Sequence, residues 1–173
     1  PTPWVSPIKV VPKPHNPEDI RLCVDMRAAN KAILRERHST PSVDEIIAEL
    51  NGSRVFSKLD LRAGYHQVEI SPESRYITTF ATHLGLKRLK RLSFGISSAS
   101  EVFQDVIRQA LEGIPGVINL SDDILLHAPT QAEHDRRLKL LLQRIVDKGL
   151  TLAPEKCEFN QTHLAFFGLI FGE

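Results

Sequence analysis

The chain contains 173 residues, 42% of them hydrophobic, which is enough to bury one core or two small lobes without disulfides. Its two cysteines, Cys23 and Cys157, lack the spacing of a disulfide framework or a zinc site. No run approaches the ~18 apolar residues of a membrane span, and the first residues lack the order of a signal peptide. The sequence therefore predicts an intracellular protein without membrane association.

The net charge of +1 says little about partners, but the charges are unevenly distributed. Residues 51–100 hold eight Lys and Arg against three Asp and Glu, whereas residues 101–173 hold seven against eleven. This pattern suits a protein that binds phosphates with one part and metal ions with another. Chance also produces such an imbalance in a chain of this length.

The first forty residues contain six of the eleven prolines, which favours extended strands and turns over helix. Two apolar segments, Ile8–Val11 and Ile20–Met26, flank a turn-like segment at Pro14–Asp19. The sequence therefore predicts a β-hairpin that carries basic side chains, among them Lys13 and Arg21.

From Thr40 the apolar period changes to that of a helix. Pro41 suits a first helical position, Ser42 and Glu45 form a capping box, and Gly52 ends the helix. The apolar face of this helix consists of Val43, Ile46, Ile47 and Leu50.

The remaining residues predict strands and two further helices. The predicted strands are Val55–Asp60, Tyr65–Ile70, Arg75–Thr82, the two halves of Val117–His127, Leu150–Leu152 and Leu164–Phe171. One helix is predicted over Ala99–Leu111, and Thr130 and Glu133 cap another that ends at Gly149. This order fits the α+β class, with an antiparallel sheet and helices packed on one face.

Two adjacent acids, Asp122 and Asp123, lie between apolar strands instead of on a polar surface loop. Carboxylates this close repel one another unless a cation compensates them, so the pair indicates a divalent metal site. The alternative is an ordinary turn, because Asp-Asp is also a common turn dipeptide between strands.

Asp60 ends the predicted strand Val55–Asp60, where its side chain can project toward a neighbouring hairpin. Taken alone, such a residue is more often a turn or cap than a ligand. Three carboxylates suit two Mg²⁺ ions about 4 Å apart, an arrangement that supports nucleotidyl transfer. Mg²⁺ binds few protein carboxylates and takes its other ligands from phosphates and water.

Six ordered blocks carry a resemblance to a known family. They are Arg21–Lys31, Phe56–Gln67, Thr78–Thr82, Phe94–Ala99 with Phe103 and Gln104, Ser121–Ile124, and Pro154–Cys157. Together they resemble the reverse transcriptase domain of gypsy-type long-terminal-repeat retrotransposon polyproteins and, more distantly, of retroviruses. The likeness covers nearly the whole chain.

The resemblance implies the fingers and palm of a polymerase. Residues 1–54 would form the fingers and residues 55–173 the palm, with residues 71–98 returning to the fingers. The thumb, connection and ribonuclease H regions of the family have no counterpart in these 173 residues.

The resemblance also implies a catalytic metal site. Asp60, Asp122 and Asp123 would be the catalytic ligands, with the backbone carbonyl of Leu61 contributing a further oxygen. Two Mg²⁺ ions would bind there, and Mn²⁺ is a possible substitute.

Substrate contacts are implied for residues outside this acidic set. Lys13 and Arg21 resemble the family's triphosphate-gripping residues, and Phe94 and Gly95 lie where the family lines its nucleotide pocket. Tyr65 matches the aromatic position that stacks under the sugar and excludes a 2′-hydroxyl, with packing beneath the hairpin as the alternative.

Three further groups are assigned by the same likeness. Lys156 lies in the block that supplies a general acid for pyrophosphate. Phe166, Phe167 and Gly168 resemble the hairpin that grips the primer, with a plain core strand as the alternative. The basic residues Lys87, Arg88, Lys90 and Arg91 would approach template phosphates, with a solvated face as the alternative.

The resemblance implies an RNA- and DNA-templated DNA polymerase that adds deoxynucleotides to a primer 3′-hydroxyl. Its partners would be a primed template, dNTPs, and the ribonuclease H and integrase regions of a parent polyprotein; the sequence predicts no oligomeric state. Three departures stand against activity: Leu120 and Lys87 replace aromatic residues, as does Leu89. They leave a truncated, non-catalytic relic that at most binds nucleic acid as the alternative.

Overall fold

The computed structural model describes residues 5–13, 16–34, 42–166 and 168–172. The chain forms two compact units, which we call the hairpin unit (Pro1–Arg37 and Tyr65–Val102) and the sheet unit (His38–Gly64 and Phe103–Glu173). These boundaries differ from a division at residue 54, because the helix that precedes residue 54 packs in the sheet unit. The assignment of fingers and palm to parts of the chain stays a prediction.

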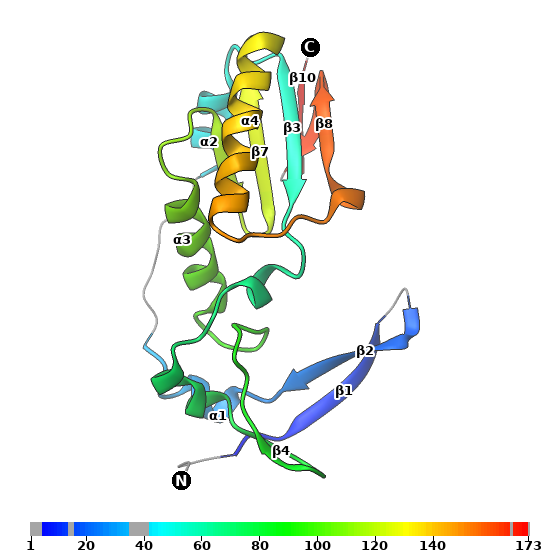
Figure 1. Cartoon of the computed structure of the whole chain (residues 1–173), viewed down its shortest axis with the longest axis vertical. Coiled ribbons are helices and arrows are strands. Elements are labelled where there is room, and N and C mark those ends of the chain that lie inside the picture. The colour runs from blue at the N-terminus through cyan, green and yellow to red at the C-terminus, as the bar shows by residue number, and fades with distance from the viewer. Residues whose placement is uncertain (1–4, 14–15, 35–41, 167, 173) are drawn as a thin grey trace. The chain divides into compact units, whose positions relative to one another are not determined.

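The hairpin unit begins with two antiparallel strands, β1 (Ile8–Lys13) and β2 (Asn16–Val24), followed by the short helix α1 (Arg27–Asn30). The predicted hairpin is confirmed, and its strands extend beyond the predicted ranges, to Lys13 in β1 and from Asn16 in β2 (Figure 1). Pro17 falls where the register shifts between Pro12 and Lys13, a position at which a residue without a backbone N–H is tolerated.

Strands predicted over Tyr65–Ile70 and Arg75–Thr82 are largely wrong. The chain instead forms two 3₁₀ segments, Gly64–Gln67 and Pro72–Thr78, and the short strands β4 (Phe80–Thr82) and β5 (Gly85–Lys87). Two features favour the tightly wound 3₁₀ conformation of the second segment: Pro72 at its start and the threonine hydroxyl groups at its end. The hydroxyls of Thr78 and Thr79 donate hydrogen bonds to carbonyls three residues earlier, at 2.8 and 2.6 Å.

The sheet unit is built on four antiparallel strands in the order β6, β7, β3, β8. The predicted strand β3 (Val55–Asp60) and the predicted hairpin of β6 (Val117–Leu120) and β7 (Asp123–Ala128) are confirmed. The edge strand β8 (Glu158–Gln161) was not predicted, because its polar, exposed residues show no apolar alternation.

Three helices accompany this sheet, and the α+β class is confirmed (Figure 1). Helices α2 (Val43–Leu50) and α4 (Gln131–Asp147) have the predicted caps at Ser42 and Thr130, and α3 spans Ala99–Leu111 as predicted. No helix in the described ranges is long and apolar enough to cross a membrane.

The two faces of the sheet are covered by different elements. On one face, His134 of α4 is fully buried and its Nε2 lies 2.9 Å from Ser57 Oγ of β3. On the other face, side chains of α2, the sheet and the C-terminal strands form one core. Its buried members are Ile46, Leu50, Phe56, Ile118, Leu120, Leu125, Leu164 and Phe166.

The last apolar segment forms a second hairpin, β9 (His163–Phe166) and β10 (Leu169–Gly172), where a single strand was predicted. Gly168 has a φ of 77° in the connecting turn, a conformation that glycine adopts without steric cost. The strand predicted over Leu150–Leu152 reduces to a single bridge between Leu152 and Leu61.

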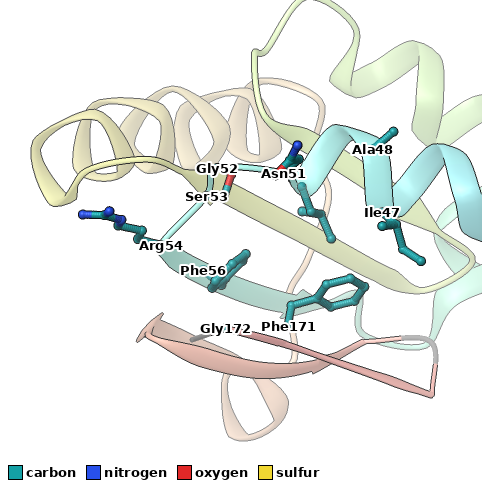
Figure 2. Close-up of a pocket in the computed structure, with 10 residues that line it drawn as sticks. Ile47, Ala48, Asn51, Gly52, Ser53, Arg54, Phe56, Phe171 and Gly172 are labelled. Carbon is teal, nitrogen blue, oxygen red and sulfur yellow. The ribbon is translucent and has the colours of Figure 1, made fainter.

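A cavity of about 510 Å³ lies beside this core, between the end of α2, the start of β3 and β10. Ile47, Phe56 and Phe171 supply apolar side chains to it, as Figure 2 shows. The described residues that line this cavity include none of the site residues predicted from the sequence.

Candidate active site

The three acids singled out by the sequence gather at one end of the sheet. β3 and β7 pair antiparallel up to their last rung, where Asp60 lies directly opposite Asp123. Asp122 precedes Asp123 in the two-residue turn that joins β6 to β7. The carbonyl of Asp122 accepts a hydrogen bond of 2.9 Å from the backbone N–H of Leu61, which ties the turn to the end of β3.

The Asp122 carboxylate lies in a restricted environment. Its Oδ1 atom is buried and has no hydrogen-bond partner among the residues that the structure describes. Burial raises the pKa of this carboxyl group above its ordinary value, and the negative charges of Asp60 and Asp123 raise it further. Lys156 opposes the shift only weakly, so a cation would relieve the environment of Asp122 most directly.

Gly64 allows the Asp122 carboxylate to occupy this position. A Cβ atom on Gly64 would overlap both carboxylate oxygens of Asp122. Gly64 also has a φ of 26°, which L side chains rarely adopt. The block Phe56–Gln67 therefore supplies both the acid Asp60 and a residue without a side chain where the second acid needs space.

Two lysines compensate the other two acids. Lys156 Nζ lies 3.3 and 3.4 Å from the two carboxylate oxygens of Asp60, and Lys58 Nζ lies 3.5 Å from Oδ1 of Asp123. Lys156 was predicted as a site residue, and the structure places it beside a predicted acid. Lys58 was missed, although its position two residues before Asp60 on a strand places both side chains on one face.

Within the described residues, no group of three or more His, Cys, Asp or Glu side chains is arranged as a ready-made metal site. The donor set nevertheless has the chemistry of one: three hard oxygen ligands, one of them buried and unpartnered. The acids are neighbours, with lysine ammonium groups in contact with two of them.

Predicted substrate contacts fall in the hairpin unit. The rings of Tyr65 and Phe94 are in contact, with centroids 4.9 Å apart and planes tilted by 50°. Gly95 follows with a φ of 93°, and its carbonyl accepts a hydrogen bond of 2.9 Å from the side-chain amide of Asn30. The same side chain accepts one of 2.9 Å from the N–H of Ser97, so it fixes the backbone on both sides of Ile96.

Asn30 was part of the motif Arg21–Lys31 but was not predicted to have a role. Its two hydrogen bonds depend on a fold that joins residues 65 positions apart, which spacing along the chain does not reveal. Lys13 and Arg21 have backbone positions on β1 and β2, while their side chains lie outside the described part of the structure.

The predicted basic segment lines a cavity of about 490 Å³ in the hairpin unit. Lys87, Arg88 and Lys90 contribute to its wall, and so does Arg75 from the second 3₁₀ segment. Among the described residues, no Asp or Glu is part of the wall. Arg91 points elsewhere, since its guanidinium donates to the carbonyl of Gln67 at 3.1 Å and it does not line the cavity.

The residues predicted to grip a primer lie in different environments. Phe166 is 1% exposed in the core of the sheet unit, and Gly168 lies in the β9–β10 turn. Phe167 lies outside the described residues. A primer contact by this hairpin stays a prediction.

Comparison with known proteins gives a consistent answer. The family model described as "Reverse transcriptase (RNA-dependent DNA polymerase)" matches residues 11–171. The chain is 34% identical over 169 residues to the retrovirus-related Pol polyprotein from transposon 412 of Drosophila melanogaster, covering 94% of this chain and 14% of that protein. It is 31% identical over 178 residues to the corresponding polyprotein from transposon gypsy of the same species, covering 98% and 17%.

Among solved structures, the native prototype foamy virus protease-reverse transcriptase matches with a TM-score of 0.85 and 26% identity, over 99% of this chain and 23% of that one. A foamy viral protease-reverse transcriptase in complex with an RNA/DNA hybrid has the same fold, with a TM-score of 0.85 at 24% identity, over 99% of this chain and 23% of that one. The chain thus spans less than a quarter of each of these relatives.

Proposed function

Because this chain belongs to the reverse transcriptase (RNA-dependent DNA polymerase) family, we propose that it extends a primer 3′-hydroxyl with deoxynucleotides, copying an RNA or DNA template. The observation that carries the proposal is the end of the sheet where Asp60, Asp122 and Asp123 adjoin one another. The relatives are retrotransposon polyproteins, so we infer that the chain works within a polyprotein that also carries ribonuclease H and integrase regions.

Asp60, Asp122 and Asp123 would hold two Mg²⁺ ions, with the Leu61 carbonyl as a further oxygen ligand and Mn²⁺ as a substitute. The unpartnered oxygen of Asp122 supports this, because a buried carboxylate without a hydrogen bond is costly unless a cation binds it. Bound there, the ions would activate the 3′-hydroxyl and stabilise the charge of the departing pyrophosphate.

The two lysines have separate roles in this proposal. We assign Lys156 Nζ as the proton donor to the leaving pyrophosphate, since it lies next to Asp60 and its side chain is 63% exposed and thus accessible to a phosphate. Lys58 is a partly buried counter-charge that holds Asp123 in place. A carboxylate that keeps a cation nearby stays ionised and ready to act as a ligand.

The hairpin unit would bind the nucleotide. Tyr65 presents a flat ring fixed by Phe94, which suits stacking under a sugar and exclusion of a 2′-hydroxyl. Phe94 is 58% exposed and available to a base or template. We assign triphosphate binding to Arg21 and Lys13, whose charges suit phosphate neutralisation.

The charge of the hairpin unit supports binding of nucleic acid. This unit holds twelve Lys and Arg against seven Asp and Glu, a net charge of +5, whereas the sheet unit holds ten against fourteen, a net charge of −4. The cavity lined by Lys87, Arg88 and Lys90 concentrates positive charge without a carboxylate in its wall. We propose that it binds phosphates of the template strand, and that Arg91 adds to the same field.

The alternative of a non-catalytic relic rests on departures from the family pattern. Leu120, where an aromatic residue is usual, is 7% exposed and packs in the core with Phe166. The turn that follows keeps Asp122 and Asp123 beside Asp60. The departure therefore leaves the acids in a usable arrangement, which favours the polymerase over the relic.

The proposal is tested by Mg²⁺-dependent extension of a DNA primer annealed to RNA, with the chain alone and with the full reading frame that encodes it. We expect incorporation of deoxynucleotides that is lost on Asp122→Asn and retained on Asp135→Asn, an exposed acid on α4. Extension that survives Asp122→Asn would show that these acids do not form the catalytic centre. A Tyr65→Val variant is expected to incorporate ribonucleotides more readily than the parent chain.

A further inference from the structure

The turn that carries Asp122 contains an unusual backbone conformation. Ser121, the first of its two residues, has a φ of 54°, in the left-handed region that favours glycine. A two-residue hairpin turn of this kind normally has glycine at that position. Something beyond the strand pairing must therefore hold Ser121 in place.

Gln104 of α3 supplies that restraint. Its side-chain carbonyl oxygen accepts a hydrogen bond of 2.7 Å from the N–H of Ser121, and its side-chain NH₂ donates one of 2.9 Å to the carbonyl of Asn119. In return, the side-chain NH₂ of Asn119 donates to the backbone carbonyl of Gln104 at 3.4 Å. The side chain of Gln104 thus forms hydrogen bonds to the backbone on both sides of Leu120, and Gln104 is buried, with 7% of its surface exposed.

The restraint acts next to a residue that has little freedom of its own. Asp122 follows Ser121 directly, and its carbonyl is bound by the N–H of Leu61. The side chain of Gln104 therefore holds the backbone just before Asp122, and the N–H of Leu61 holds the carbonyl of Asp122 itself. The carboxylate orientation then follows from the backbone, because Gly64 lies against its oxygens.

We propose that Gln104 is a positioning residue, whose side chain fixes the Ser121 backbone and thereby aims Asp122. The effect on catalysis rests on the proposed polymerase function, whereas the clamp itself does not. The side chain of Gln104 acts on Asp122 through the backbone of the turn, to which it is bound at Asn119 and Ser121.

The chemistry of the clamp requires an amide. A glutamate in place of Gln104 accepts from Ser121 but cannot donate to Asn119, and it brings a charge into a buried site. A methionine has nearly the same length and volume but neither group, so Gln104→Met removes both hydrogen bonds while preserving most of the packing. Gln109 provides a matched control on the same helix, because it is exposed and its side-chain NH₂ donates to Oδ2 of Asp105 at 2.6 Å, within the helix itself.

Amide hydrogen exchange measures the clamp directly and does not depend on activity. We expect the Ser121 amide to exchange at least tenfold faster in Gln104→Met than in the parent chain, with no change in Gln109→Met. The amide of Leu141, deep in the core, reports any general loss of stability. If the Ser121 and Leu141 amides accelerate equally, Gln104 is a packing residue and the proposal is wrong.

A second variant keeps the test decisive if Gln104→Met folds poorly. Ser121→Gly removes the strain of the positive φ, so it should restore part of the stability lost in Gln104→Met and have a smaller effect in Gln109→Met. Equal effects in both backgrounds would overturn the link between Gln104 and the Ser121 backbone.

The catalytic consequence is measured separately. Gln104→Met should lower kcat for nucleotide incorporation about tenfold and leave KM for the primed template unchanged, and unchanged kcat would overturn the aiming role. If Asp122→Asn proves fully active, the proposed function fails, but the exchange of Ser121 still decides whether the clamp exists.

Discussion

Asp60 and Asp123 are direct cross-strand partners on the last rung shared by β3 and β7. Like charges in this position destabilise a sheet, and each of the two is contacted by its own lysine. Asp122, beside them, has a buried carboxylate oxygen without a hydrogen-bond partner among the described residues, and burial and the two neighbouring acids raise its pKa. We therefore infer that the three acids lower the stability of the metal-free fold and that a bound cation would offset this cost.

The loss of stability that the three acids cause in the metal-free protein predicts the effect of Asp122→Asn. Removing the charge should raise the free energy of unfolding of the metal-free protein, since a buried amide costs less than a buried carboxylate and is not repelled by the neighbouring acids. Urea denaturation in EDTA measures the change, with Asp147→Asn on α4 as a control expected to have little effect. A lower stability for Asp122→Asn would contradict the strain assigned to this carboxylate.

Gly64→Ala tests the space that Asp122 requires. The added Cβ would overlap the Asp122 carboxylate, so we expect a loss of about 2–3 kcal/mol in the free energy of unfolding. Gly113→Ala is the matched control, because Gly113 also has a positive φ, 83°, but has open space around it. Its expected cost is about 1 kcal/mol, from backbone strain alone. Similar losses for both variants would exclude a steric role for Gly64.

His127 makes the fold sensitive to mild acid. Burial and the nearby charge of Arg137 lower the pKa of this imidazole to about 4, while the pKa in the unfolded chain stays near 6.5. Between these values the unfolded state binds a proton that the folded state does not, so stability falls as pH decreases through this range.

The expected loss from His127 between pH 7 and pH 5 is about 2 kcal/mol. Urea denaturation at both pH values should show a smaller loss of unfolding free energy in His127→Gln, because glutamine has no group that titrates between pH 5 and pH 7. The neutral ring of the parent chain bonds Ser53 Oγ through Nδ1 at 2.8 Å, so Ser53→Ala serves as a control that removes the bond and keeps the pH dependence. An unchanged pH dependence in His127→Gln would contradict the assignment.

The basic cavity of the hairpin unit predicts the salt dependence of nucleic-acid binding. Replacing Lys87, Arg88 or Lys90 by Gln should each weaken binding of a primed template equally for all sequences and reduce the slope of log K against log salt by about 1. Fluorescence anisotropy from low to moderate salt measures the slope. Lys148→Gln, at the end of α4 in the sheet unit, is the control. An unchanged slope in all three variants would show that these basic side chains form a solvated surface and do not bind nucleic-acid phosphates.

The sequence predicts best where a local signal is strong. The capping box of Ser42 and Glu45 and the Thr130 cap define the starts of two helices, and their hydrogen bonds are present in the structure. Alternation defines β3, and the Asp pair marks the turn between β6 and β7. Each of these signals is complete within a few neighbouring residues, so tertiary contacts have little to add.

The features that were missed have no decisive pattern in the sequence, or they depend on contacts between distant residues. The two 3₁₀ segments, Gly64–Gln67 and Pro72–Thr78, belong to the first kind, because hydrogen bonds such as that of the Thr78 hydroxyl to the Arg75 carbonyl form locally in segments where strands were predicted. Gln104 sits beside the apolar face of α3, where periodicity alone gives a polar residue no role. Its function appears only when the fold brings the turn seventeen residues later within hydrogen-bonding distance.

The most direct test of the central claim is single-turnover incorporation of one deoxynucleotide on a primed RNA template, with Mg²⁺ added or chelated. We expect incorporation by the unmodified chain with Mg²⁺, none with chelator, and a loss of at least a hundredfold on Asp60→Asn, Asp122→Asn and Asp123→Asn, while the Asp147→Asn control keeps full activity. Incorporation that persists in any of the three acid variants at the rate of the control would contradict a catalytic centre formed by these carboxylates.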